Sequence, residues 1–250
     1  MQVAALYDIH GNLPALEAVL AEIKKEGTEQ IVVGGDVFPG PMASECLERL
    51  LALRTPTHFI RGNGERELLA TAHGDEPKAL PDPVREVLRW NAAQLSAKHR
   101  QVLERWPKTL RFTIPSAGDI LFCHATPRDD NEIFTRLTPE EKLAPIFAGL
   151  NVSAVVCGHT HMQFERETGR VNVVNAGSVG MPFGATGAFW LAVGAAGTLE
   201  LRRTGYDLER AAEHIRKTDY PHAADFAARY VLDAPSEAKT LEVLTKAELK

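Results

Sequence analysis

The 250-residue sequence has little cysteine and few aromatic residues, and it shows no excess of basic residues. Its three cysteines form no CxxC pair and are odd in number, so neither a disulfide framework nor a zinc ribbon is indicated. With 28 Lys and Arg against 33 Asp and Glu, the formal charge is -5, which argues against a surface for binding duplex nucleic acid. We expect the cysteines to be buried thiols in a reducing cytoplasm.

Long hydrophobic runs are also missing. No stretch approaches the roughly 18 apolar residues of a membrane-spanning helix, and the N-terminus shows no basic leader followed by an apolar run. The sequence therefore predicts a cytoplasmic protein without a membrane partner. Hydrophobic residues make up 44% and charged residues 24%, as in an ordinary globular chain, and the length suits one large α/β domain or two small ones.

Strand and helix patterns alternate along the first third of the chain. Short apolar runs predict strands at 3–7, 31–33 and 57–60, and leucines at helical spacing between them predict helices at 13–26 and 42–53. Such units imply a parallel sheet with right-handed crossovers. Further strands are predicted at 109–114, 120–123, 154–157, 163–167, 170–174, 188–193 and 198–203, with a hairpin turn at 116–119.

Residues 64–106 are expected to be mainly helical, with a short helix at 65–71 and a longer one at 83–106. We interpret them as a helical excursion beside the sheet, within a single domain that spans residues 1–250. A later helix is predicted at 138–150, with the Thr138 hydroxyl as its cap. The chain is expected to be helical again from about residue 207 to its end.

Five of the predicted strands end at side chains that can bind a metal. Ligands bind outside the carboxyl ends of strands in open α/β sheets, so these side chains should converge on one rim. A single Asp or His at a strand end is usually a cap or a hydrogen-bonded rim residue, but five such coincidences are not expected by accident. The candidate ligands are Asp8, His10, Asp36, Asn63, His124, His159 and His161.

These residues supply oxygen and nitrogen ligands without any thiolate, a set that suits Mn, Fe, Zn, Ni or Co. Seven ligands are too many for one ion, and they suit two divalent ions that share a carboxylate. The remaining histidines fall in strand or helix bodies or in polar stretches, and we expect them outside the site: His58, His73, His99, His214 and His222.

The order of these blocks resembles the calcineurin-like metallophosphoesterase superfamily, and the chain is most similar to small bacterial and archaeal phosphodiesterases of the YfcE kind. The matching blocks are DxHGN at 8–12, GGD at 34–36, GN at 62–63, the strand-end His124, GHTH at 158–161 and the stretch NAGS at 175–178. The resemblance implies an α/β fold, a two-sheet β-sandwich flanked by helices on both faces. It also implies a binuclear metal-dependent phosphoesterase.

The resemblance further implies the role of each ligand. One metal would be held by Asp8, His10, Asp36 and His161, and the other by Asp36, Asn63, His124 and His159. Asp36 would bridge the two together with a hydroxide that attacks phosphorus, so Asp36, Asn63 and His124 would serve catalysis. Asn12 and Arg61 are additional candidates, as contacts of the phosphate.

The sequence departs from this family at Gly64. Many relatives carry a His after the GN pair that is thought to protonate the leaving group, and glycine cannot do so. We therefore expect a preference for phosphodiesters or for esters with acidic leaving groups, with Glu65 as a less favoured substitute acid. The natural substrate and the oligomeric state stay open, and a homo-oligomer could form through the helical segments.

Other functions stay open as well. A phosphomonoesterase, or a protein or dinucleotide polyphosphate phosphatase on the same fold, would favour monoesters or anhydrides. A non-catalytic scaffold of the retromer-subunit type would bind partner proteins, and an unrelated metal or redox protein would release no phosphate.

Overall fold

The computed structural model describes residues 1–114 and 118–249, and its strands form two five-stranded sheets. The first sheet has the order β10 (Leu199–Thr204), β9 (Ala188–Val193), β1 (Val3–Leu6), β2 (Gln30–Val33) and β3 (Thr57–Phe59). The second has the order β4 (Thr109–Ile114), β5 (Gly118–Cys123), β6 (Ala154–Cys157), β8 (Val171–Asn175) and β7 (Phe164–Thr168). The predicted parallel pairs β1–β2 and β2–β3 are present, and β5, β6 and β8 are parallel in the second sheet.

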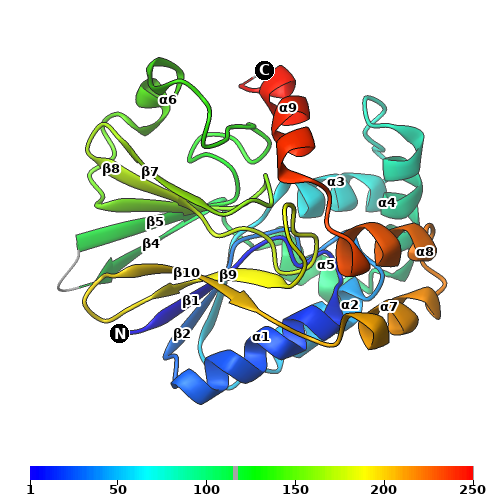
Figure 1. Cartoon of the computed structure of the whole chain (residues 1–250). Coiled ribbons are helices and arrows are strands. Elements are labelled where there is room, and N and C mark those ends of the chain that lie inside the picture. The colour runs from blue at the N-terminus through cyan, green and yellow to red at the C-terminus, as the bar shows by residue number, and fades with distance from the viewer. Residues whose placement is uncertain (115–117, 250) are drawn as a thin grey trace.

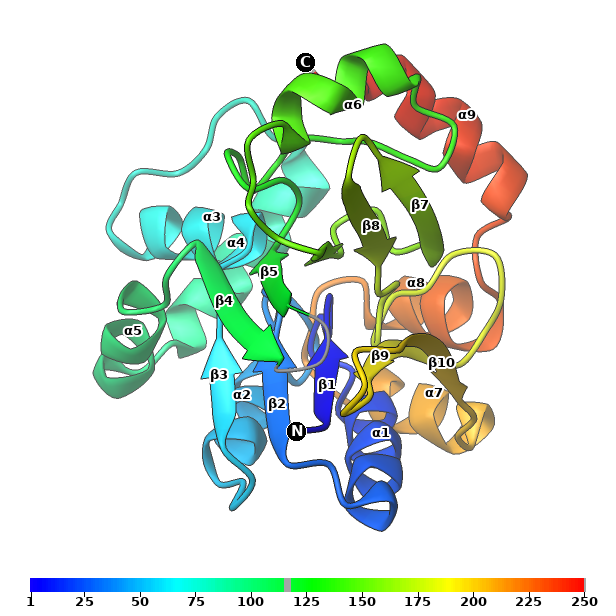
Figure 2. The ribbon, with the colours of Figure 1, turned by 90° about the vertical axis from the view of Figure 1, so that its left-hand side faces the viewer.

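The two sheets lie face to face, and helices cover the outer face of each (Figure 1, Figure 2). Helices α1 (Leu13–Glu26) and α2 (Ala43–Leu51) pack on the first sheet, and α6 (Glu140–Phe147) packs on the second. This arrangement confirms the two-sheet sandwich flanked by helices on both faces. Along the described residues, no helix combines the length and the apolar character needed to cross a membrane.

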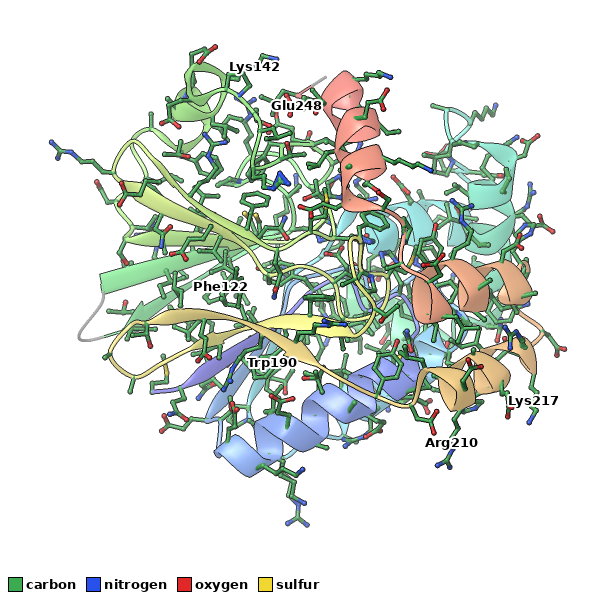
Figure 3. All side chains as sticks on the ribbon, viewed as in Figure 1. Phe122, Lys142, Trp190, Arg210, Lys217 and Glu248 are labelled. Atoms are coloured by element: carbon green, nitrogen blue, oxygen red, sulfur yellow. The ribbon has the colours of Figure 1, made fainter. Side chains whose placement is uncertain are left out.

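The side chains of strand β1 alternate between two layers of the hydrophobic core. Val3 and Ala5 face the second sheet, whereas Ala4 and Leu6 face the helices outside the first sheet. Successive side chains of a strand point to opposite faces, and an apolar run without alternation therefore marks a strand covered on both sides. Figure 3 shows the same division, with Phe122 in the layer between the sheets and Trp190 on the side of α1.

The helical segment after β3 differs from the prediction. It contains α3 (Asn63–Ala72), α4 (Asp82–Gln94) and α5 (Ala97–Glu104), so the single helix predicted at 83–106 is wrong. Leu95 has an extended conformation, and the Ser96 hydroxyl accepts a hydrogen bond from the His99 amide to start a new helix. A serine that prefers to cap a helix has interrupted an otherwise continuous apolar pattern.

The expected cap of the helix near residue 140 is also corrected. Helix α6 begins at Glu140, and the Thr138 hydroxyl instead accepts from the Thr135 amide and donates to Glu248. The predicted hairpin turn at 116–119 lies partly outside the described residues. The end of the chain is helical as expected, with α7 (Leu208–Arg216), α8 (Ala223–Phe226), a π-helical turn η1 (Ala227–Leu232) and α9 (Glu237–Ala247).

Candidate metal centre

The candidate ligands come from both sheets, and hydrogen bonds between strand ends bring the two sets together. The Asp8 carboxylate, after β1, accepts a 2.8 Å hydrogen bond from the His159 amide, after β6. His124, after β5, contacts the carbonyl oxygen of Gly34, after β2, through Nδ1 at 2.9 Å. The carboxyl ends of the two sheets therefore meet at one rim, as the strand-end pattern predicts.

The backbone at this rim is strained. Positive φ values are uncommon for residues other than glycine, and each costs about 1–3 kcal/mol unless the surroundings impose it. Such strain concentrates at functional sites, where it directs side chains to a point that regular structure would not reach. Five of the seven candidate ligands have this conformation: Asp8 (φ 52), His10 (φ 44), Asp36 (φ 54), His159 (φ 67) and His161 (φ 58).

Three imidazoles are oriented in the same way. In each, Nδ1 contacts a backbone carbonyl oxygen, so that Nδ1 carries the proton and Nε2 turns its lone pair toward the rim. This is how the protein matrix usually fixes the tautomer of a metal-binding histidine. The pairs are His10 with Pro39 at 3.2 Å, His124 with Gly34 at 2.9 Å and His161 with Met181 at 2.8 Å.

The two aspartates each have one oxygen held by the backbone and one directed to the rim. Asp36 Oδ1 accepts from the Gly64 amide at 2.8 Å, and its Oδ2 lies 3.5 Å from His124 Nε2 and 3.8 Å from His10 Nε2. Asp8 Oδ1 is buried without any hydrogen-bond partner and lies 3.4 Å from His161 Nε2. A buried carboxylate oxygen rarely stays unpaired, so this one fits the role of a metal ligand.

The donor groups fit divalent ions. Ligand atoms lie within 4.8 Å of one another in two sets that share Asp8, one with His10 and His161 and the other with Asp36 and His124. Nε2 of His10 and Nε2 of His161 are 3.3 Å apart, a contact that a shared cation would stabilise.

Two further candidate ligands lie beside these sets. Asn63 Oδ1 lies 3.0 Å from His124 Nε2 and so joins the second set. His159 lies outside both sets, with its ring centroid 5.2 Å from that of His124. The division of ligands between two ions stays a prediction.

Charges inside the rim shift the imidazoles in opposite directions. Burial opposes protonation of His124, but the negative charges of Asp36 and Asp8 raise its pKa to about 10. Burial and the positive charge of His124 lower the pKa of His159 to about 4. The two carboxylates of the rim therefore favour a positive charge beside them. Divalent cations would supply that charge in place of the proton on His124.

Gly64 occupies a position where no side chain fits. A Cβ atom there would lie 2.2 Å from the Phe38 carbonyl oxygen and 2.8 Å from Asp36 Oδ1. The first turn of α3 thus packs directly on the loop after β2, and the Gly64 amide donates to Asp36 across this contact. With this backbone, position 64 cannot carry a proton-donating side chain.

The two residues predicted to contact phosphate, Asn12 and Arg61, differ in their hydrogen bonds. Asn12 is fully buried, and its amide donates to the Gly180 carbonyl and the Tyr206 hydroxyl, while its Oδ1 accepts from the Ala15 amide at the start of α1. Asn12 therefore caps helix α1, and its contact with phosphate stays a prediction. Arg61 has a buried Nε without a hydrogen-bond partner, and its contact with phosphate stays a prediction.

Residues behind the rim hold the ligands in place. Glu65, predicted only as a less favoured acid, is buried and accepts hydrogen bonds from three backbone amides, those of Asp36, Phe38 and Gly62. In the stretch 175–178, the Asn175 amide donates to the Gly158 carbonyl, and the Ser178 hydroxyl donates to the Asp8 carbonyl. These residues connect the strand-end loops to one another.

Comparison with known proteins gives one family. A family model described as the calcineurin-like phosphoesterase superfamily domain matches residues 1–194. An uncharacterized protein from Methanocaldococcus jannaschii is 26% identical over 238 residues, covering 88% of this chain and 93% of that protein.

Solved structures show the same fold. A hypothetical protein from Pyrococcus horikoshii has a TM-score of 0.75 and 24% identity, covering 93% of this chain and 99% of that one. A metallophosphoesterase from Sphaerobacter thermophilus has a TM-score of 0.72 and 22% identity, covering 91% of this chain and 99% of that one. The closer resemblance to the YfcE kind stays a prediction.

Proposed function

Because the chain belongs to the calcineurin-like phosphoesterase superfamily, we propose that it is a metal-dependent hydrolase of small phosphate esters. One observation carries the proposal: two buried carboxylates and three imidazoles, each fixed by the backbone, direct their free ligand atoms to one rim. Because the formal charge of the chain is -5, we propose that its substrates are small phosphate esters and not duplex nucleic acid. Three buried, free cysteines support a cytoplasmic location.

We further propose that two divalent ions occupy this rim. Asp8 belongs to both sets of ligand atoms, and Asp36 Oδ2 lies 3.8 Å from His10 Nε2 and 3.5 Å from His124 Nε2. These two distances, one to an imidazole of each set, support Asp36 as the shared ligand that the family resemblance implies. Bound divalent ions would stabilise negative charge on phosphate oxygens and lower the pKa of water. The chain itself contributes orientation, since each Nδ1–carbonyl contact prevents the imidazole from turning away.

The first prediction tests the function directly. Purified protein treated with a chelator is expected to lose at least about 10²-fold in turnover of bis(p-nitrophenyl) phosphate, because the charge that stabilises the transition state is removed. Re-addition of Mn, Ni or Zn should restore turnover, and metal analysis should find about two ions per chain. Phosphate release that continues unchanged in the metal-free protein would contradict the proposal, as would a reloaded protein that hydrolyses none of a panel of diesters, monoesters and anhydrides.

The second prediction concerns the leaving group. Since no side chain fits at position 64, we propose phosphodiesters and esters with acidic leaving groups as preferred substrates. A general acid is typically worth about 10²- to 10⁴-fold, so p-nitrophenyl esters should be hydrolysed faster than the matching alkyl esters by a factor in that range. The measurement is kcat/KM for each pair of esters, and equal values would show that another group supplies the proton.

A further inference from the structure

A cavity of about 460 Å³ lies directly beside the metal centre. His10, a candidate ligand, forms part of its wall. So do Pro39 and Met181, whose carbonyl oxygens orient His10 and His161. The cavity therefore adjoins the rim at which a phosphate would bind. Its volume is in the range of pockets that hold a small organic group.

The far walls of the cavity come from the C-terminal helices and α4. Val84 and Val87 of α4 line it together with Phe226 of α8, Tyr220 and Tyr230. Figure 1 shows α4 and α8 in the same corner of the molecule, and apolar contacts join α4 to the C-terminal helices. Segments far apart in the sequence thus form one largely apolar compartment.

Aromatic rings lead from the metal centre into this compartment. Phe183 stacks on His161 at a centroid distance of 5.0 Å with an interplanar angle of 26°. Tyr230 follows at 6.5 Å from Phe183, and Phe226 lies 5.5 Å from Tyr230. Tyr220 is 6.0 Å from Phe226. The side of the cavity is therefore built from ring faces and edges that a flat ligand can contact.

Unusual backbone geometry brings polar groups to the same walls. The π-helical turn η1 carries Arg229 and Tyr230, and such turns occur often at functional sites. His222 has a positive φ of 63° and pairs with Glu86 at 3.0 Å. Arg229 is exposed, lies 5.8 Å over the ring of Tyr230, and has no acidic partner among the described residues.

We propose that this cavity binds a planar aromatic substituent of the phosphate ester, such as a nucleobase or an aryl group. The inference rests on the proposed function, because the phosphate would be anchored at the adjoining rim. Ring faces and a guanidinium without an acidic partner favour a flat π-system over an aliphatic chain, since both interact with its face. Arg229 and Tyr230 are then specificity-determining residues that the sequence did not indicate.

Direct binding tests the cavity without turnover. The full-length, Mn-loaded protein is titrated by calorimetry with phenylphosphonate, with methylphosphonate and with inorganic phosphate. The two phosphonates carry the same charge and differ in the aromatic ring. We expect phenylphosphonate to bind about 10-fold tighter than methylphosphonate, an advantage in the range of one ring stacking on aromatic side chains.

Tyr230→Leu is expected to reduce that advantage by about 3- to 10-fold and to leave the affinity for methylphosphonate unchanged. Phe189→Leu is the matched control, because Phe189 is also half-buried and lies under a guanidinium, that of Arg203 at 5.6 Å, outside the cavity. The control should retain the full advantage of phenylphosphonate.

Three outcomes would overturn the inference. Equal affinities of the native protein for both phosphonates would refute the aromatic site but leave the proposed function intact, provided that inorganic phosphate binds. Failure of all three ligands to bind the Mn-loaded protein would refute both the aromatic site and the proposed function. Should Tyr230→Leu not fold, Val84→Trp, at an exposed position on the cavity wall, fills the space instead, and an undiminished advantage in that variant would refute the site.

Discussion

Asp36→Ala is expected to lower turnover of phosphate esters by about 10³-fold or more, the size of loss that follows when stabilisation of transition-state charge is removed. Asp36 Oδ2 lies 3.8 Å from His10 Nε2 and 3.5 Å from His124 Nε2, so alanine removes an oxygen that is close to one imidazole of each ligand set. Bound metal should fall from about two ions per chain to one or none. The measurements are kcat/KM with a diester and metal content after dialysis.

The loss must be separated from a change in folding, since Asp36 Oδ1 also accepts from the Gly64 amide at the start of α3. Asp207→Ala is a matched control, because Asp207 accepts from the Arg210 amide at the start of α7 without being a candidate ligand. It should cost about 1 kcal/mol of stability and leave turnover unchanged. If Asp36→Ala retained both metal ions and more than a tenth of native turnover, Asp36 would not be the shared ligand.

The strand-end pattern made most of the rim predictable from the sequence. Strands such as β1 and β2 are short apolar runs, and the first polar side chain after each lies at the same edge of a parallel sheet, so Asp8 and Asp36 could be placed together. What the pattern could not show is orientation. His10 and His161 are turned by carbonyl oxygens of Pro39 and Met181, which lie in loops without any periodicity of their own.

Two features that the sequence pattern did not show have the same physical origin. Asn12 follows a strand-end motif and could reach a phosphate, but its side chain serves the first turn of α1 because a buried amide must satisfy its own hydrogen bonds. Similarly, Ser96 starts a new helix within an apolar pattern that favours one long helix. In both cases a local hydrogen bond decided a role that apolar spacing does not encode.

Little in the sequence indicated the structural role of Glu65. Substitution of Glu65 is nevertheless expected to have the second large effect, on stability and on metal affinity. Its Oε2 accepts from the amides of Asp36 and Gly62 at 2.9 Å each, and its Oε1 accepts from the amide of Phe38 at 3.1 Å. One buried carboxylate thus joins the loop that carries Asp36 to the start of α3, where Asn63 lies. Burial and the negative charge of Asp36 raise the pKa of Glu65 to about 7, although hydrogen bonds from the three backbone amides act to lower this pKa.

Glu65→Gln places an amide NH₂ where the carboxylate accepts from backbone N–H groups, so at least one buried donor loses its partner. We expect the free energy of unfolding to fall by about 3 kcal/mol and the affinity for Mn to fall by about 10- to 100-fold, as for other groups that support metal ligands. Glu248→Gln is the control, because Glu248 is also buried and accepts from the hydroxyls of Thr135 and Thr138, beside Lys142 of α6 (Figure 3). A hydroxyl can rotate to donate or accept, whereas a backbone amide cannot, so this control should lose less stability and no metal affinity. Denaturant unfolding and Mn titration measure both quantities, and a Glu65→Gln variant that binds Mn as tightly as the native protein would show that the two loops keep their ligands in place without this carboxylate.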